Sequence, residues 1–191
     1  MLSGLITGNL PEEIICSGKG YPVFTDFRAW IEIERVLFEK EGNFADKLPT
    51  LLTLCSRTLP ETLAEAVNGM AAFYAGGAPR YRADKRKRCF RRLYSFSQDA
   101  SLIYAGFYQQ YGMDLTKAQL HWFQFKALLA GLSEDTQFVR AMHYRAVDVS
   151  SLKSKEQRQF YRRMKELYRL RDYRSEAERE ADVSKVLEDL F

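Results

Sequence analysis

Residues 120–132 read LHWFQFKALLAGL, and bulky apolar side chains fill most of this run. At 3.6 residues per turn they point nearly all round a helix, which is the pattern of a buried helix rather than a surface helix. We expect this helix to be capped by Thr116, to end at Gly131 and to lie at the centre of the core. Its expected core residues are Leu120, Trp122, Phe123, Phe125, Leu128 and Leu129.

On the N-terminal side of this run, apolar residues recur at three- and four-residue steps and predict three helices. The first is capped by Thr25 and Asp26 and extends to Lys40, the second covers 48–56, and the third begins at Pro60 and ends at Gly76 and Gly77. Expected buried stripes are Phe27, Trp30, Ile31, Leu37 and Phe38 in the first helix, with Glu32, Arg35 and Glu39 between them, and Leu63, Val67, Met70 and Tyr74 in the third.

Four more helical patterns are predicted in the remaining sequence. One is capped by Ser97 and stops at Gly112, another begins after Ser133 with two acids at its positive end, and a third covers 155–171. Expected stripes are Ile103, Tyr104, Phe107 and Tyr111 in the first of these, and Phe160, Met164, Leu167 and Tyr168 in the third. A solvent-facing helix is expected from Ser175, with a weak apolar seam at Ala181, Val183, Val186, Leu187 and Leu190.

The N-terminal residues 14–24 carry a different signal, two short apolar runs on either side of Gly18-Lys19-Gly20. Glycines permit the positive φ of a tight turn, so a β-hairpin is predicted, with Pro22 confined to an edge strand. Together these patterns predict a mainly α fold. It is a single helical domain with a short N-terminal β-hairpin and an exposed basic connector.

Charge is distributed unevenly along the chain. Residues 1–77 carry 6 basic and 10 acidic side chains, residues 78–92 carry 8 and 1, and residues 93–191 carry 15 and 14. The net charge of +4 therefore comes from one short segment. We divide the chain into an N-terminal hairpin and helices (1–77), a basic mobile connector (78–92), the C-terminal helical core of the same domain (93–174) and a peripheral helical tail (175–191).

The basic segment is the sharpest local signal in the sequence. Its like charges repel each other and disfavour a packed helix. It could neutralise phosphates of a nucleic acid, with Tyr81 and Phe90 stacking on bases, or dock on an acidic protein, or serve only as a solvated loop. The candidate residues for binding an anionic partner are Arg80, Arg82, Lys85, Arg86, Lys87, Arg88, Arg91 and Arg92.

Enzyme signatures are absent: the sequence has no GxSxG, P-loop, GxGxxG or HExxH motif. His121 and His143 lie 22 residues apart without a ligand-type neighbour at one-turn spacing, so His121 is expected to be hydrogen-bonded in or near the core and His143 at the surface. Cys16 and Cys55 are expected to be small core residues. We predict no catalysis, metal or cofactor, and no membrane span, which favours a cytoplasmic protein.

Several short motifs, in a fixed order, resemble a family of bacteriophage and prophage proteins known as the gene-product-fifteen proteins. The most recognisable is LHWFQFKALLAGL at 120–132 followed by Glu134-Asp135, preceded by FSQDA at 96–100, IYAGF at 103–107 and QYGMDL at 110–115. TDFRAWI at 25–31 and FYAGG at 73–77 also match. The residues at the centre of these motifs are Asp26, Phe27, Arg28, Trp30, Asp99, Tyr104, Phe107, His121, Trp122 and Phe125.

The resemblance implies a non-catalytic protein of the phage tail module, encoded between the major tail protein and the tape-measure protein. That position is similar to the position of tail assembly chaperones, so the expected partners are the tape-measure protein, the tail-tube protein, or both. The expected location is the cytoplasm of the bacterial host, or the virion. Two alternatives stay open: a structural tail or connector component of the virion, and a nucleic-acid-binding module that uses residues 80–92.

Overall fold

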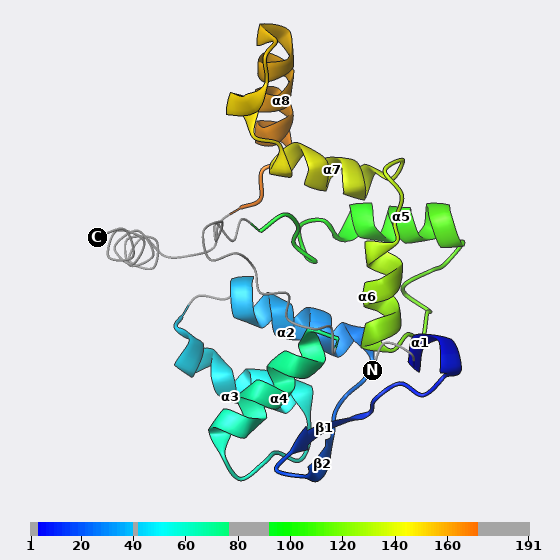
Figure 1. Ribbon diagram of the computed structural model, residues 1–191, viewed down its shortest axis with the longest axis vertical. Coiled ribbons are helices and arrows are strands. Elements are labelled where there is room, and N and C mark those ends of the chain that lie inside the picture. Colours follow the sequence, from blue (N-terminus) through cyan, green and yellow to red (C-terminus); the bar gives the residue numbers. More distant parts are fainter. Residues whose placement is uncertain (1–3, 40–41, 77–91, 172–191) are drawn as a thin grey trace.

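The computed structural model describes residues 4–39, 42–76 and 92–171 (Figure 1). Within these ranges it contains eight α-helices, one short 3-10 helix and one two-stranded antiparallel sheet. The predicted mainly α class with an N-terminal hairpin is therefore confirmed. The tail from Ser175 and all of the basic connector except Arg92 lie outside the described residues.

The hairpin lies where the two glycines predict it. After the short helix α1 (Gly4–Thr7), strand β1 (Glu13–Cys16) pairs with β2 (Lys19–Pro22), and Gly18 adopts the left-handed φ of +79° that the turn requires. One face of β1 packs against α4 (Leu63–Tyr74), where Cys16 and Ile14 are buried. Packing on a helix supplies the stability that a lone two-stranded hairpin lacks.

Helices α2 (Phe27–Glu39) and α3 (Phe44–Cys55) form the rest of the N-terminal half with α4. Two predictions are wrong in detail. Phe38 is 48% exposed and Leu63 is 56% exposed, whereas Ile33 and Val36 of α2, and Ala66 and Phe73 of α4, are buried. The third helix begins after Thr62 rather than at Pro60, and Gly76, at a φ of +74°, follows its end.

The central helix, α6 (Trp122–Ala130), is shorter than its sequence pattern suggests. Its N-cap is His121 rather than Thr116, and Leu120 precedes it. Trp122, Phe123 and Phe125 are buried as predicted, but Gln124, Ala127 and Ala130 are exposed, so the helix is covered on most sides and not on all. Helix α5 (Ala100–Tyr111) ends at Gly112 as expected.

The caps of two further helices also differ from the predicted residues. Ser97 lies in the turn before α5 and donates a hydrogen bond to Glu39 instead of capping. Helix α7 (Gln137–Ala146) is capped by Thr136, which leaves Glu134 and Asp135 in the preceding turn. The short helix η2 (Val149–Ser151) leads into α8 (Lys155–Leu167), which stops four residues before the predicted end.

Stacked aromatic rings from α2, α4, α5 and α6 form the centre of the core. The ring of Phe125 lies 4.7 Å from that of Phe27 and 5.3 Å from that of Phe107, while Trp30 stacks on Phe73 at 4.8 Å and on Trp122 at 6.2 Å. All six of these aromatic residues are at most 4% exposed. Residues from both halves thus share one core, and stacked rings add stability beyond their buried area.

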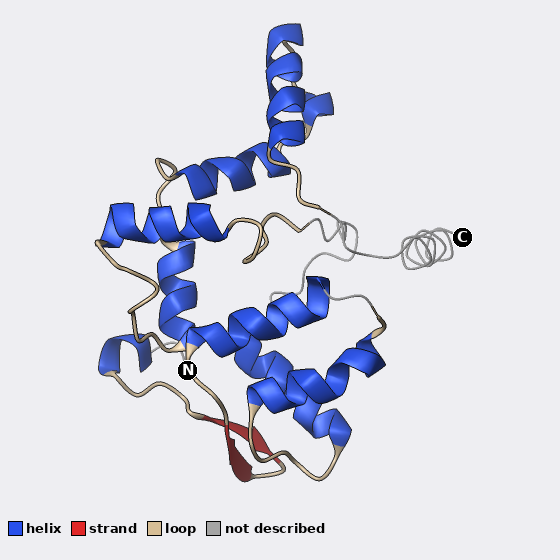
Figure 2. Ribbon diagram, turned by 180° about the vertical axis from the view of Figure 1, so that it is seen from behind, coloured by secondary structure: helices blue, strands red, loops and turns tan. Residues whose placement is uncertain are grey.

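The helices are arranged along one long axis. The hairpin lies at one end with α3 and α4, α5 and α6 lie in the middle, and α8 lies at the opposite end beside α7 (Figures 1 and 2). None of the helices in the described ranges is long and apolar enough to cross a membrane.

Candidate functional site

The motif residues near the two helix starts hold α2 against α6. Trp122 N–H donates to the carbonyl of Thr25 at 2.7 Å, and Phe27 N–H donates to that of Leu120 at 3.2 Å. His121 Nδ1 accepts from Phe123 N–H, which leaves Nε2 to donate to the carbonyl of Pro11 at 2.9 Å. His121 is therefore a capping residue with both ring nitrogens in use, as expected for a core histidine, and His143 is exposed.

The guanidinium of Arg28 performs a similar structural task. It pairs with Asp26 at 3.0 Å and donates to the carbonyls of Leu115 and Ala118, both at 2.9 Å. The motif residues on α2 and α6 thus join segments that lie about ninety residues apart in the chain. Tyr104, in contrast, is 37% exposed, so its predicted place in a buried stripe is wrong.

Asp99 and Arg145 form a buried ion pair that the charge pattern did not reveal. The guanidinium reaches both carboxylate oxygens, at 2.7 and 2.8 Å, and both side chains are at most 7% exposed. Arg145 also donates to the carbonyls of Leu93 and Tyr168, and Asp99 accepts from Ser95 N–H. These additional hydrogen bonds to both charged groups offset the cost of removing the ion pair from water.

A second buried cluster joins the two halves around Glu34. Its carboxylate accepts from the hydroxyl of Tyr74 and pairs with Arg92 at 3.3 Å, and Arg92 also pairs with Glu39 at 3.2 Å. Burial raises the pKa of Glu34 despite its bonds to Tyr74 and Arg92, and burial likewise raises the pKa of Tyr94 to about 12. Glu39, expected on the polar side of its helix, is only 7% exposed in its side chain.

Arg92 therefore belongs to the folded core, and its predicted place in the exposed connector is wrong. Its side chain is 28% exposed and its guanidinium lies over the ring of Phe38. The other seven basic candidates, from Arg80 to Arg91, lie outside the described residues. Among the candidates for binding an anionic partner, the one that the structure describes is thus already paired within the protein.

Helices α7, η2 and α8 form a projection (Figure 1), which we call the arm (residues 137–171). Its base is fixed, because Arg145 holds the carbonyl of Tyr168 and Gln98 exchanges hydrogen bonds with the backbone of Arg171 at 2.7 and 3.2 Å. Its outer helix, α8, has no buried residue and packs mainly on α7 and η2. Figures 1 and 2 show α8 projecting from the end of the molecule.

Aromatic rings cover one side of the arm. Tyr144 of α7 lies 6.1 Å from Phe160 of α8 and stacks on Tyr168 at 5.6 Å. On α8 itself, Phe160 is 49% exposed and Leu167 is 68% exposed, although the sequence pattern placed both in a buried stripe. The apolar side of α8 is thus only half covered by α7. Exposed apolar groups of this kind, bordered by polar residues, mark interaction sites.

The arm is also strongly basic. Residues 140–171 carry ten Lys or Arg and three Asp or Glu. Arg145 is neutralised by Asp99, but no carboxylate of the described residues lies within ion-pair distance of Arg158, Arg162 or Arg163. An apolar stripe on a strongly basic arm suits a partner that is both apolar and acidic.

Comparison with known proteins places this structure in a family. Residues 6–170 match the family model described as bacteriophage Gp15 protein. The chain belongs to the bacteriophage Gp15 protein family. Membership indicates a phage structural or assembly protein. The match confirms the predicted resemblance and covers the arm as well as the core. No curated protein and no solved structure matches the chain.

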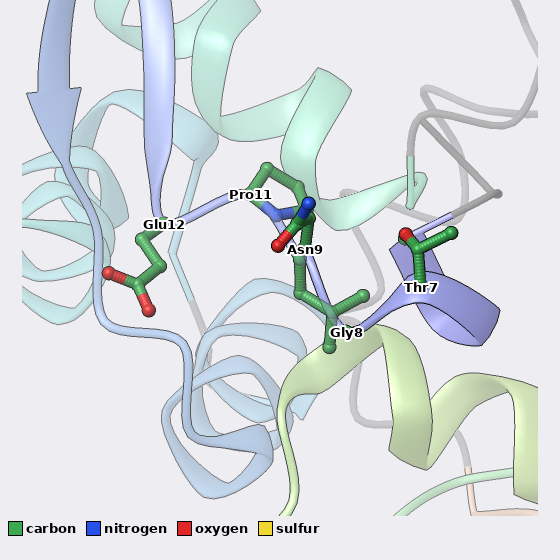
Figure 3. A pocket seen from close by; sticks show the side chains of 7 residues that line it. Thr7, Gly8, Asn9, Pro11 and Glu12 are labelled. Atoms are coloured by element: carbon green, nitrogen blue, oxygen red, sulfur yellow. The ribbon is translucent and has the colours of Figure 1, made fainter.

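A cavity of about 460 Å³ lies at the N-terminal end of this Gp15-family chain, lined by Gly4 and residues 7–12 (Figure 3). Its labelled side chains of Thr7 and Glu12 lie on opposite sides and do not converge on a common point. In the described part of the chain, no three metal-ligating side chains gather to form a cation site. The arm therefore stands as the candidate functional site.

Sequence reasoning missed three charged residues in this arrangement, although a signal was present for two of them. Glu34 follows Trp30 by one helical turn, and Arg145 follows Phe138 and Ala141 at helical spacing, so both fall on buried faces. A charge on a buried face predicts a buried partner. Glu39, which lies at the end of α2, offered no such signal.

Proposed function

We propose that this protein is a non-catalytic tail assembly chaperone that binds the tape-measure protein, the tail-tube protein, or both, in the cytoplasm of the bacterial host. Family membership supports the coarser role of a phage structural or assembly protein. The observation that carries the finer role is the arm, a firmly attached helical projection whose apolar side is half uncovered. A partner that keeps long helical subunits from aggregating needs such an exposed helical surface.

Co-expression with the full-length tape-measure protein of the same phage tests this proposal. We expect the soluble fraction of the tape-measure protein to rise and the two proteins to co-elute in size-exclusion chromatography. Unchanged solubility together with separate elution would contradict the chaperone role. The same experiment with the tail-tube protein decides which partner is bound.

A structural component of the mature virion is the second candidate, and family membership supports it equally. Quantitative mass spectrometry of purified virions separates the two. A chaperone acts during assembly and is expected to be missing from the particle, or far below the amount of the tail-tube protein. A structural component is present at a fixed stoichiometry.

A further inference from the structure

The apolar side of α8 has a defined geometry that specifies its partner. Phe160, Met164 and Leu167 follow one another at steps of four and three residues, so they lie in one line on the helix surface. With a rise of 1.5 Å per residue, this line is about 10 Å long. Met164 is half-buried, whereas Phe160 and Leu167 are open to a partner. We call this line the α8 stripe.

One cation borders the α8 stripe directly. Arg163 lies three residues after Phe160 and four before Leu167, so it is the surface neighbour of both, and it is exposed. Arg162 lies on nearly the opposite face of the helix, and Glu156, four residues before Phe160, is bonded to Ser154. With five basic and two acidic side chains, α8 as a whole carries a net positive charge. A partner that covers the stripe therefore meets Arg163 beside its apolar contacts and the positive field of the whole helix.

We propose that the α8 stripe binds an acidic amphipathic helix of a partner protein, with apolar residues at three- and four-residue spacing and carboxylates beside them. A straight line of side chains along a helix is matched by a second helix, whose side chains pack into the grooves beside it. Charge complementarity then selects acidic over basic helices. The proposal rests on the proposed function, because it gives the chemistry of the segment by which an assembly partner is held.

Charge also argues against a second copy of this chain as the occupant. Apart from the buried Arg145, each arm carries nine basic and three acidic side chains over residues 140–171, and pairing two arms would bring these like charges together. Like charges in opposition are destabilising. The chain's own residues 175–191, which carry six acidic and two basic side chains, lie outside the described residues, and variants in this segment test whether it occupies the stripe.

Two synthetic peptides of about 18 residues, long enough to form helices, provide the probe. Both have Leu at helical spacing on one face, and their polar positions are Glu-rich in one peptide and Lys-rich in the other. Binding to the full-length protein is followed by fluorescence anisotropy. We expect the acidic peptide to bind at least about tenfold more tightly than the basic one, and this preference to shrink at high salt.

Substitutions in the α8 stripe test whether the peptide binds there. Leu167→Ser and Phe160→Ser are each expected to weaken binding of the acidic peptide by about tenfold or more, because they remove an apolar contact at the centre of the interface. Tyr108→Ser is the matched control, since Tyr108 is 59% exposed on α5 outside the arm, and it should leave binding unchanged. Unchanged thermal unfolding shows that each variant is folded.

Each remaining outcome overturns the proposal. Equal affinity for both peptides would show that the stripe does not select by charge. No binding of either peptide would show that the stripe is not a binding site. Binding that appears only after Leu187→Ser and Leu190→Ser assigns the stripe to the chain's own C-terminal residues. A dimer that dissociates in Leu167→Ser assigns it to a second copy. The co-expression test does not depend on α8, so the proposed function and this inference can fail separately.

Discussion

At Arg145 a positive charge is held inside the protein by one carboxylate and two backbone carbonyls, and it joins the arm to the segment before α5. Arg145→Met keeps much of the side-chain volume but leaves the carboxylate of Asp99 buried without its cation. Breaking a buried pair in this way costs about 3–5 kcal/mol. We expect Arg145→Met to lower the free energy of unfolding by this amount, as measured by urea denaturation.

Arg140→Met is the matched control for this prediction, because Arg140 lies on the same helix with a 51% exposed side chain and a distant contact to Asp135 at 3.9 Å. Exposed pairs contribute little, so the control should change stability by less than about 0.5 kcal/mol. Similar losses in both variants would contradict the structural role of Arg145.

Glu34 gives stability a pH dependence with a definite sign. Burial raises the pKa of its carboxyl above the ordinary value of 4.5, so the folded protein holds this proton more tightly than the unfolded chain. The contribution to stability is complete below pH 4.5 and is lost as the pH rises through the raised pKa. Glu34→Gln removes this titration and still accepts the bond from Tyr74.

The measurement for Glu34 is the free energy of unfolding at a series of pH values above 4.5, for the wild type and for Glu34→Gln. We expect stability to fall more steeply with rising pH in the wild type. The difference between the two curves isolates Glu34 from the other carboxylates. Parallel curves would show that the pKa of Glu34 is the same in both states.

At the scale of elements, α6 contributes two of the largest buried side chains, with Trp122 at 1% and Phe125 at 0% exposure. Trp122→Ala removes a ring that stacks on Trp30, Tyr74 and Phe125. Truncating a buried aromatic residue costs about 3–5 kcal/mol, a large part of the stability of a typical domain. A lowered melting temperature, or loss of cooperative unfolding, is the expected result in calorimetry.

Tyr108→Ala provides the comparison for Trp122→Ala, because it truncates an aromatic residue that is 59% exposed. Its effect should stay within about 0.5 kcal/mol. A cooperative Trp122→Ala protein with an unchanged melting temperature would contradict the place of α6 at the centre of the core.

Periodicity identified the elements of this fold but placed several of their ends wrongly. Thr116 and Ser97 are good capping residues by type, yet the chain before α6 is held by the bonds of Arg28 to Leu115 and Ala118, and Ser97 is held by Glu39. These contacts link residues far apart in sequence, so no local pattern contains them. His121 caps α6 in a role that residue-type preferences do not predict.

The candidate site was predictable only in part. The apolar stripe of α8 was visible in the sequence, but periodicity gives the same signal for a stripe that is covered and for one that is open. Phe160 and Leu167 are open because α7 packs on only one side of α8 and the arm projects from the end of the molecule (Figure 1). Its attachment includes the long-range bonds of Arg145 to Tyr168 and Asp99, which no local pattern contains.

At the scale of the whole molecule, the basic residues 85–88 lie in the sequence between Tyr74 and Arg92, two residues that bind the same carboxylate. Tyr74 and Arg92 both bond Glu34, so this carboxylate links the described parts of the chain before and after that segment. Changing Lys85, Arg86, Lys87 and Arg88 together to Ser should alter stability by no more than about 0.5 kcal/mol per site. Arg92→Met, in contrast, leaves Glu34 and Glu39 without their cation and should be clearly destabilising.

Chemical denaturation of these two variants tests the prediction, and brief digestion of the native protein with trypsin adds a second measurement. From the sequence we expect the first cuts within residues 80–91, because segments with little to bury open at low free-energy cost. A quadruple variant that melts as readily as Arg92→Met would show that these residues belong to the packed fold.

The central claim is that this protein assists tail assembly by holding a partner on its arm. The most direct measurement compares co-expression of the tape-measure protein with the wild type, with Leu167→Ser and with the control Tyr108→Ser. We predict that the wild type and Tyr108→Ser keep the tape-measure protein soluble and co-elute with it, and that Leu167→Ser, although folded, does not. Equal solubility with all three proteins would contradict the role of the arm, and an insoluble tape-measure protein in every case would contradict the chaperone function itself.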